Sequence, residues 1–372
     1  MVNFSNNAFS TLKKLVNQKL FKKILIISGK KSYFASGAEK LIKKILKDKE
    51  TYLLLKKNKY PEIKELKKII LYTRRIKPDL IIAVGGGSVI DYAKMANILN
   101  PEKNLTKQII NSDYGKIKKF TKLLAIPTTA GTGAEVTSNA VIYMGKIKFS
   151  VESELLKPNY FIIIPEFVLK AGKTLKASSG FDAISQAIES LISKKSTKES
   201  AEFALKSLRI SLKYFLEHLK NPTITNSYNM CVAANYSGKA ISISKTTAPH
   251  ALSYPFTAHY GISHGHAVSL TLNDFLKFNF ENIEQSNCKF DLLKRYKKIF
   301  NATKTSNISE LNLFINRIKL RAGLENNFSK LGINIKDNLP KILSGVNDQR
   351  LSNNPIEITK RDIKNILLKK IY

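Results

Sequence analysis

The segment Asp79–Lys94 reads DLIIAVGGGSVIDYAK and predicts a buried strand, a glycine-rich turn and a helix in direct succession. The short apolar run before the glycines is typical of a strand in a parallel sheet. Three consecutive glycines let the backbone turn tightly and come close to a ligand, and the amides of the helix that follows attract an anion. We therefore predict a pyrophosphate-binding loop formed by Gly85, Gly86, Gly87, Ser88 and Asp91. A plain tight turn is the alternative, because the segment matches neither the G-x-G-x-x-G fingerprint nor a P-loop.

Strand and helix patterns alternate on both sides of this segment. Apolar runs predict strands over 22–28, 52–55, 123–126 and 161–164, helical periodicity predicts helices over 38–46 and 63–76, and a hairpin is predicted within 140–151. This alternation predicts a parallel α/β sheet. The strand over 123–126 ends in a second loop rich in small and hydroxyl residues. Because ligands bind at the carboxyl ends of such strands, we expect this loop to contribute Thr128, Thr129 and Thr132 to the same ligand site.

Helical periodicity replaces the strand signals from about residue 171 onward. We therefore predict an α/β dinucleotide-binding domain over 1–171 and an all-α domain over 172–372. Two capping boxes, Ser196 with Glu199 and Thr359 with Asp362, are expected to begin helices in this second half.

The composition predicts a globular protein with a strong positive charge. The chain has 372 residues, 43% of them hydrophobic, and a net charge of +34. Its 62 basic residues include only eight scattered Arg, whereas specific nucleic-acid recognition relies on clustered Arg. We expect no specific nucleic-acid partner; weak, salt-sensitive association is the alternative. The charge is expected to attract small anionic substrates and phosphorylated cofactors.

Cysteine usage and hydropathy indicate a cytoplasmic location. Cys231 and Cys288 are the only cysteines and have no closely spaced partner, which argues against a disulfide framework and a cysteine-rich metal site. The sequence offers no apolar core of signal-peptide length and no stretch of membrane-spanning length. We expect no membrane association.

A histidine cluster marks the candidate metal site. The segment 245–266, KTTAPHALSYPFTAHYGISHGH, holds four of the five histidines of the chain. His250 and His264 are separated by Pro255 and Gly261, which predicts one histidine near a helix end and the other at the start of the next helix. Histidines that only cap or pack are the alternative.

Asp182 and Gln186 are two further candidate ligands. They are four residues apart in a predicted helix, so their side chains point the same way. Together with the two histidines they would offer a divalent metal one carboxylate, one amide oxygen and two imidazoles. An ordinary surface pair is the alternative.

Four motifs, GGGSVIDYAK, AIPTTAGTGAEVT, GFDAISQAIES and HGHAV, resemble the iron-containing alcohol dehydrogenase family in order along the chain. The resemblance implies a dehydroquinate synthase-like architecture and a metal- and NAD(P)-dependent alcohol dehydrogenase. It places the metal ligands at Asp182, Gln186, His250 and His264, and it favours Fe2+. Most relatives have His where this chain has Gln186; because an amide is a poorer ligand than imidazole, Zn2+ stays open.

Within the family, Gln186, the run KTTAPHALSYP and the ending HGHAV are most similar to phosphonoacetaldehyde reductases. This implies reduction of a small anionic aldehyde, phosphonoacetaldehyde, to 2-hydroxyethylphosphonate. We expect Lys245 to bind the phosphonate and Tyr254 or His266 to donate the proton that the alkoxide needs. The alternatives are a reductase of ordinary short-chain aldehydes such as butanal or lactaldehyde, and a dehydroquinate synthase-like cyclase.

The cofactor is expected to be NADP(H) rather than NAD(H). NAD-dependent relatives place an Asp after the first strand, where this chain has Ser28-Gly29-Lys30-Lys31-Ser32. An acid there would repel a 2′-phosphate, and Lys30 would attract it. Lys148 is expected to line the cofactor site as well. The sequence does not determine the oligomeric state, and a homodimer is one option.

Overall fold

The computed structural model describes residues 8–18, 21–101, 104–112, 114 and 118–370. The chain divides into two compact units, Met1–Gly172 with Thr223–Asn235, and Lys173–Pro222 with Tyr236–Tyr372. The boundary predicted at 171 and 172 lies beside the division between Gly172 and Lys173. The segment Thr223–Asn235, which we placed in the helical domain, groups instead with the first unit.

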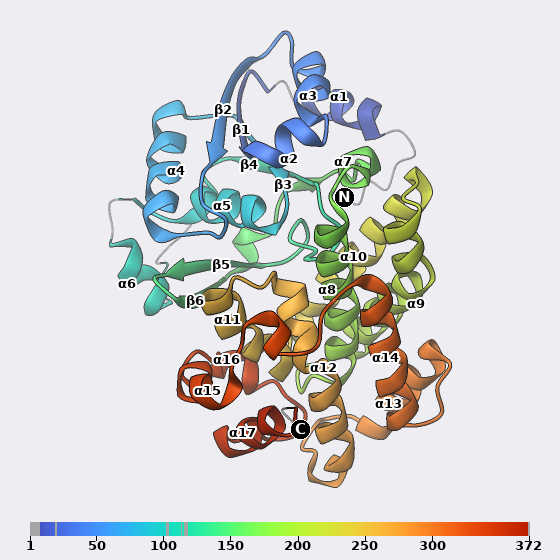
Figure 1. The fold of residues 1–372 in the computed structure, drawn as a ribbon. Coiled ribbons are helices and arrows are strands. Elements are labelled where there is room, and N and C mark those ends of the chain that lie inside the picture. Colours follow the sequence, from blue (N-terminus) through green and yellow to red (C-terminus); the bar gives the residue numbers. More distant parts are fainter. Residues whose placement is uncertain (1–7, 19–20, 102–103, 113, 115–117, 371–372) are drawn as a thin grey trace. The chain divides into compact units, whose positions relative to one another are not determined.

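The first unit is built on a five-stranded parallel sheet with the strand order β2-β1-β3-β4-β7 (Figure 1). Its strands are β1 (Lys23–Gly29), β2 (Glu50–Lys56), β3 (Leu80–Gly85), β4 (Lys122–Pro127) and β7 (Tyr160–Phe161). All five predicted strands are present. The last is shorter than the predicted 161–164 and pairs with β4 through two residues.

Helices cover both faces of the sheet, which explains why the central strands are apolar on both sides. The helices of this unit are α1 (Ala8–Gln18), α2 (Lys30–Ala35), α3 (Ala38–Ile45), α4 (Ile63–Ile76), α5 (Gly87–Ile98), α6 (Leu105–Ile110) and α7 (Pro165–Leu169). Alternate residues such as Ile24, Ile82 and Leu124 pack with side chains of α1, α3 and α7. In Figure 1, α4 and α5 lie on the other side of the sheet.

The predicted hairpin is present as the antiparallel pair β5 (Asn139–Met144) and β6 (Ile147–Glu152). Its two-residue turn contains Gly145 at a φ of 63°, a conformation that glycine adopts without steric strain. An isolated bridge between Glu62 and Tyr143 connects the hairpin to the segment before α4. A short 3-10 turn, Glu154–Leu156, follows β6.

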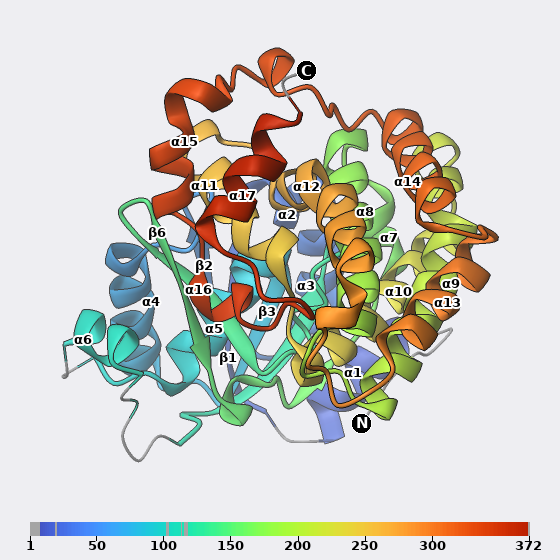
Figure 2. The same cartoon turned by 90° about the horizontal axis from the view of Figure 1, so that it is seen from below.

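The second unit is helical, as predicted (Figure 2). Its helices are α8 (Lys173–Ile192), α9 (Lys198–Lys220), α11 (Ala248–Tyr260), α12 (His264–Glu281), α13 (Leu292–Thr303), α14 (Ile308–Ala322), α15 (Ile335–Ser344), α16 (Asp348–Leu351) and α17 (Lys360–Leu368), with 3-10 turns at Ile283–Gln285 and Ser329–Leu331. Helix α10 (Ile224–Ser244) begins in the first unit and ends in the second. Helix α8 packs against α9 and α12, and its residues from Gly180 to Ile192 are all buried.

One of the two predicted capping boxes is wrong. Helix α9 is capped by Thr197 and Ser200, each of whose hydroxyls accepts the backbone N–H of the other, and not by Ser196 and Glu199. The predicted box of Thr359 and Asp362 is confirmed at the start of α17. No helix among the described residues is both long enough and apolar enough to cross a membrane.

Candidate metal centre and cofactor loop

Asp182 and Gln186 lie one turn apart on the buried part of α8. The Nε2 of Gln186 donates to Oδ2 of Asp182 at 3.1 Å, so the two side chains point the same way, as their spacing predicts. Both side chains are almost completely buried. A carboxylate at such a place needs partners, because an isolated buried charge is strongly destabilising.

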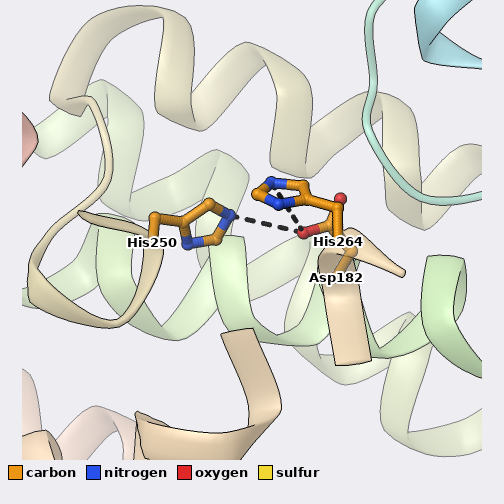
Figure 3. A group of neighbouring side chains, drawn as sticks. All are labelled: Asp182, His250 and His264. Atoms are coloured by element: carbon orange, nitrogen blue, oxygen red, sulfur yellow. Dashed lines mark ion pairs between the residues drawn. The ribbon is translucent and has the colours of Figure 1, made fainter. Parts of the chain in front are cut away.

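His250 and His264 come from two different helices and approach the same carboxylate oxygen. His250 lies in the first turn of α11, and His264 is the first residue of α12, after Gly261 ends α11 in a left-handed conformation. The Nε2 of His250 is 3.3 Å from Oδ1 of Asp182, and the Nε2 of His264 is 4.0 Å from it. Figure 3 shows both rings directed at this oxygen. The predicted break between two helices is confirmed.

Gly265 allows this approach because it lets α12 lie directly on α8. A Cβ added at Gly265 would be 2.0 Å from the carbonyl oxygen of Ser178 and 2.8 Å from the Cβ of Asp182. Any side chain there would force the two helices apart. Gly265 therefore sets the distance between its neighbour His264 and Asp182.

Glu189 orients His250 from the side opposite the cluster. Its fully buried carboxylate accepts from Nδ1 of His250 at 2.5 Å, and from the backbone N–H and the hydroxyl of Thr247 at 2.7 and 2.9 Å. Because an ionised carboxylate only accepts, the Nδ1 atom carries a proton, and Nε2 is the atom available to a metal. We missed Glu189 in the sequence, although it lies seven residues after Asp182 and hence on the same face of the helix.

The charges around His250 favour its protonated form. Burial by itself would lower the pKa of His250, but the negative charges of Glu189 and Asp182 and the hydrogen bond to Glu189 outweigh burial and raise the pKa to about 10. A metal ion that binds Nε2 at neutral pH must therefore displace a proton.

The atoms of the cluster fit a divalent ion. Oδ1 of Asp182 and Nε2 of His250 are buried, and neither has a hydrogen-bond partner among the described residues. Asp182, His250 and His264 each offer one ligand atom, and these atoms lie within 4.8 Å of one another. Metal–ligand bonds of roughly 2.0–2.1 Å in tetrahedral geometry place ligand atoms about 3.3 Å apart. The distance from His250 to Asp182 agrees with this value. One carboxylate and two imidazoles are a donor set that suits divalent transition metals.

The glycine-rich and threonine-rich loops meet at the carboxyl ends of β3 and β4. Strand β3 ends at Gly85, Gly86 is the N-cap of α5, and the helix begins at Gly87. A Cβ on Gly86 would be 3.2 Å from Oγ1 of Thr129, and a Cβ on Gly87 would be 3.0 Å from the side chain of Thr132. The structure thus brings the two predicted loops together. Ser88 follows in the first turn of α5, and Thr128 donates its backbone N–H to the carbonyl oxygen of Gly85.

Asp91 is turned away from this loop toward the hairpin. Its Oδ2 accepts the backbone N–H of Val141 at 3.2 Å, and burial raises its pKa to about 6, against the opposing charges of Lys94 and Lys148. Lys148 is buried on β6, close enough to interact with this carboxyl group. Lys30 is exposed at the carboxyl end of β1, in the first turn of α2.

Two family models account for almost the whole chain. The model described as iron-containing alcohol dehydrogenase matches residues 1–165, and the model of the C-terminal part of the Fe-containing alcohol dehydrogenase family matches residues 176–371. The chain belongs to the iron-containing alcohol dehydrogenase family.

Curated relatives of this alcohol dehydrogenase family include two enzymes named for small substrates. A phosphonoacetaldehyde reductase of Streptomyces viridochromogenes is 31% identical over 216 residues, which cover 55% of this chain and 54% of the relative. A 4-hydroxybutyrate dehydrogenase of Clostridium kluyveri is 30% identical over 211 residues, which cover 54% of this chain and 55% of the relative. The matched part spans little more than half the length of either relative.

Solved structures confirm the fold predicted from the sequence. The sulfoacetaldehyde reductase of Bifidobacterium kashiwanohense, solved in complex with NAD+, has a TM-score of 0.84 at 24% identity and covers 98% of this chain and 95% of its own. An iron-containing alcohol dehydrogenase of Thermotoga maritima has a TM-score of 0.83 at 25% identity, with the same coverage.

Tyr254 and His266, the two predicted proton donors, have different surroundings. Tyr254 is buried, and its ring centre is 6.3 Å from that of His264. The Nε2 of His266 lies instead 2.8 Å from the backbone carbonyl oxygen of Glu325. The structure therefore brings the ring of Tyr254 next to that of His264, whereas the Nε2 of His266 contacts the backbone of Glu325.

Lys245 lies in a link between two helices, a few residues before His250. Helix α10 ends at Ser244 and α11 begins at Ala248, and Lys245 has a left-handed φ of 61° in the link between them. In the same link, Thr247 is the N-cap of α11 and is held by Glu189. The sequence did not show this break because the local pattern of small residues fits both a helix and a link.

Proposed function

We propose that this protein is a metal-dependent oxidoreductase that uses a nicotinamide cofactor to reduce an aldehyde to a primary alcohol. The main support is the pair of buried atoms, Oδ1 of Asp182 and Nε2 of His250, which lie 3.3 Å apart without hydrogen-bond partners. A divalent ion would satisfy both atoms, and the chain belongs to a family of iron-containing oxidoreductases.

We propose an aldehyde with an anionic group as the substrate, with phosphonoacetaldehyde as the first candidate. The relatives named above act on phosphonoacetaldehyde, sulfoacetaldehyde and 4-hydroxybutyrate, which all carry a negative charge. The net charge of +34 favours the approach of such molecules. Lys245, three residues before Ala248 and the helix that carries His250, is the proposed partner of the anionic group.

In the proposed mechanism, Asp182, His250 and His264 hold the metal. A bound divalent ion supplies Lewis-acid polarisation of the aldehyde carbonyl, while the dihydronicotinamide supplies hydride. Glu189 keeps the proton of His250 on Nδ1, so that Nε2 faces the cluster. The hydroxyl of Tyr254, whose ring centre is 6.3 Å from that of His264, is the proposed proton source for the product oxygen. His266 is the second candidate, although its Nε2 is bound at Glu325.

We propose NADP(H) as the preferred cofactor and Fe2+ as the preferred metal, with Zn2+ as the alternative. Gly85, Gly86, Gly87 and Ser88 would bind the pyrophosphate at the N-terminus of α5, with Thr128, Thr129, Thr132 and Lys148 as further contacts. The contact between the two loops supports this assignment. The exposed Lys30 and Lys31 after β1 would attract a 2′-phosphate.

Steady-state kinetics test this function. We expect the protein loaded with Fe2+ or Zn2+ to oxidise NADPH with phosphonoacetaldehyde, with a kcat/KM about tenfold or more above that for butanal, a difference of roughly 1.4 kcal/mol. Sulfoacetaldehyde and succinic semialdehyde would rank the anionic groups, and NADH in place of NADPH would test the cofactor preference. Equal efficiencies with phosphonoacetaldehyde and butanal would refute the anionic substrate, and no oxidation of NADPH with any aldehyde would refute the reductase.

The variant Lys245→Met gives a matched control for the substrate. We expect it to lower kcat/KM for phosphonoacetaldehyde and to leave butanal reduction unchanged, because only the anionic aldehyde has a group for this lysine to bind. An equal loss with both substrates would instead indicate a general structural effect.

A further inference from the structure

Both ends of the Gln186 amide are already bound to protein. Its Nε2 donates to Oδ2 of Asp182 at 3.1 Å, and its Oε1 accepts the hydroxyl of Ser237 at 2.9 Å. All three side chains are buried. We infer that Gln186 is a positioning residue and not a metal ligand, so that the metal is held by three protein side chains: Asp182, His250 and His264. This inference rests on the metal binding proposed above.

The chemistry of Asp182 determines which way the amide faces. An ionised carboxylate has only acceptor oxygens, so the atom 3.1 Å from Oδ2 must be the amide NH2 group. Rotating the amide by half a turn would place its oxygen against the carboxylate and its NH2 group against Ser237. The observed orientation is therefore the one in which both buried contacts join a donor to an acceptor.

Turning Oε1 toward a metal would break both hydrogen bonds in a buried environment. Leaving a buried polar group without its partner costs about 1–3 kcal/mol. The groups affected would be Oδ2 of Asp182 and the hydroxyl of Ser237, both almost completely buried. A neutral amide oxygen is a weak ligand for late first-row metals, so ligation offers little to offset this cost.

The hydrogen bond from Gln186 also determines which oxygen of Asp182 is available to a metal. Gln186 occupies Oδ2, and Oδ1 is left facing Nε2 of His250 at 3.3 Å and Nε2 of His264 at 4.0 Å. Three protein ligands leave a tetrahedral ion with one open position, which is the arrangement of catalytic rather than structural metal sites. Gln186 thus leaves a coordination position open while it holds the carboxylate in place.

Metal binding by variants of residues 186 and 237 tests this inference. Metal-free protein, Gln186→Ala, Ser237→Ala and the double variant are titrated with Zn2+ against a chromophoric chelator and with Co2+ by visible absorption. His264→Ala serves as the ligand-loss control, and circular dichroism of the metal-free variants checks their folding. Since Ser237 is a small residue whose hydroxyl donates to Gln186, its truncation removes this hydrogen bond with the smallest change of volume.

If Gln186 positions Asp182, both single variants weaken Zn2+ binding by about 10- to 100-fold, the range for groups that orient a ligand. The double variant then binds Zn2+ about as tightly as the single variant with the lower affinity, because the two residues act through one chain of hydrogen bonds. The Co2+ spectrum keeps its shape in each of them. His264→Ala weakens binding further and changes the spectrum, and Gln186→His strengthens binding and changes the spectrum by adding an imidazole.

Other results would overturn the inference. Gln186 is a ligand if Gln186→Ala changes the Co2+ spectrum and weakens binding as much as His264→Ala does, while Ser237→Ala binds like the wild type. In that case the proposed function still stands. If the wild-type protein binds none of Zn2+, Co2+ and Fe2+, the proposed metal centre itself is wrong.

Discussion

Gly265 shows how the absence of a side chain can position a reactive residue. A Cβ at this position would meet the backbone of Ser178 at 2.0 Å, and backbone cannot move aside as a flexible side chain does. The small size of Gly265 keeps α12 on α8 and His264 over Asp182. Neighbouring His264 is visible in the sequence as a candidate ligand, whereas the role of the glycine depends on a contact with a distant helix.

We predict that Gly265→Ala lowers both stability and metal affinity. Inserting a methyl group into such a close contact costs typically about 1–3 kcal/mol of unfolding free energy. Moving His264 away from Asp182 should weaken Zn2+ binding by about tenfold or more. Urea unfolding and chelator competition measure the two effects. Gly172→Ala is the matched control, because nothing lies within 4 Å of a Cβ at that position; equal behaviour of the two variants would contradict the prediction.

We predict that Glu189→Gln weakens metal binding by about 10- to 100-fold while the protein stays folded. Glutamine has the same shape, but it removes the charge that holds the Nδ1 proton of His250. Zn2+ titration by chelator competition measures the affinity. Glu199→Gln, at an exposed position of α9, provides the control. Unchanged Zn2+ affinity in Glu189→Gln would show that His250 needs no such partner.

Among individual residues, the sequence predicted those whose metal-binding chemistry follows from their residue type and spacing. Asp182, His250 and His264 carry metal-binding groups, and the structure gathers them. Glu189 and Ser237 were missed because their roles depend on partners 61 and 51 residues away, at His250 and Gln186. No local pattern reveals such pairs.

At the scale of elements, the packing of α12 against α14 buries a lysine. Lys319 is 1% exposed, and its Nζ donates to the backbone oxygen of Ser269 at 3.0 Å and to Oδ1 of Asn273 at 2.7 Å. Burial and the positive charge of Lys370 together lower the pKa of Lys319 to about 7, although the negative charge of Asp274 acts in the opposite direction. The folded protein therefore loses this proton near neutral pH.

This lowered pKa predicts that Lys319 makes stability depend on pH. Between about pH 7 and the ordinary lysine pKa of about 10.4, the unfolded chain keeps the proton that the folded protein releases. The unfolding free energy of the wild type should therefore rise with pH relative to Lys319→Met, in which no group titrates at this position. Urea unfolding from about pH 7 to about pH 9 measures the difference, with the exposed Lys297→Met as control. A constant difference between wild type and Lys319→Met would exclude the effect.

Strands and long helices followed from hydrophobic periodicity, but helix ends did not. The helix Ile63–Ile76 and the central strands agree closely with their predictions, since a buried face repeats over many residues. The start of α9 was wrong by one residue because Ser196 and Thr197 are both good N-caps, and only the geometry selects Thr197. The left-handed Lys245 was missed because this conformation is rare outside glycine.

At the scale of the whole molecule, the charge of the chain predicts salt-dependent catalysis. With a net charge of +34, long-range attraction should raise the encounter rate with anionic aldehydes, and dissolved salt screens it. We expect kcat/KM for phosphonoacetaldehyde to fall about three- to tenfold between about 20 and about 200 mM NaCl. Butanal, which is neutral, should show little change in the same assay. Equal salt dependence for the two aldehydes would mean that the charge does not steer the substrate.

The assignment of Thr223–Asn235 to the first unit lay beyond sequence reasoning. Asn235 donates to Oε1 of the buried Glu135 at 2.9 Å, across 100 residues of sequence. Helical periodicity shows that this segment forms a helix, but not which neighbour the helix joins. The boundary near residue 172 was accessible because the pattern of the chain changes there from alternating strands and helices to helices alone.

The candidate ligands belong to three helices: α8 carries Asp182, and the consecutive helices α11 and α12, much later in the chain, carry His250 and His264. An ion shared by them would act as a cross-link that exists only in the folded chain. At a free metal concentration of about 100 times Kd, such binding adds about 2.7 kcal/mol to the unfolding free energy. Cells starved of the metal should then contain less of the protein itself, because newly made chains that remain unloaded are degraded faster, and immunoblotting after metal restriction would reveal the shortfall.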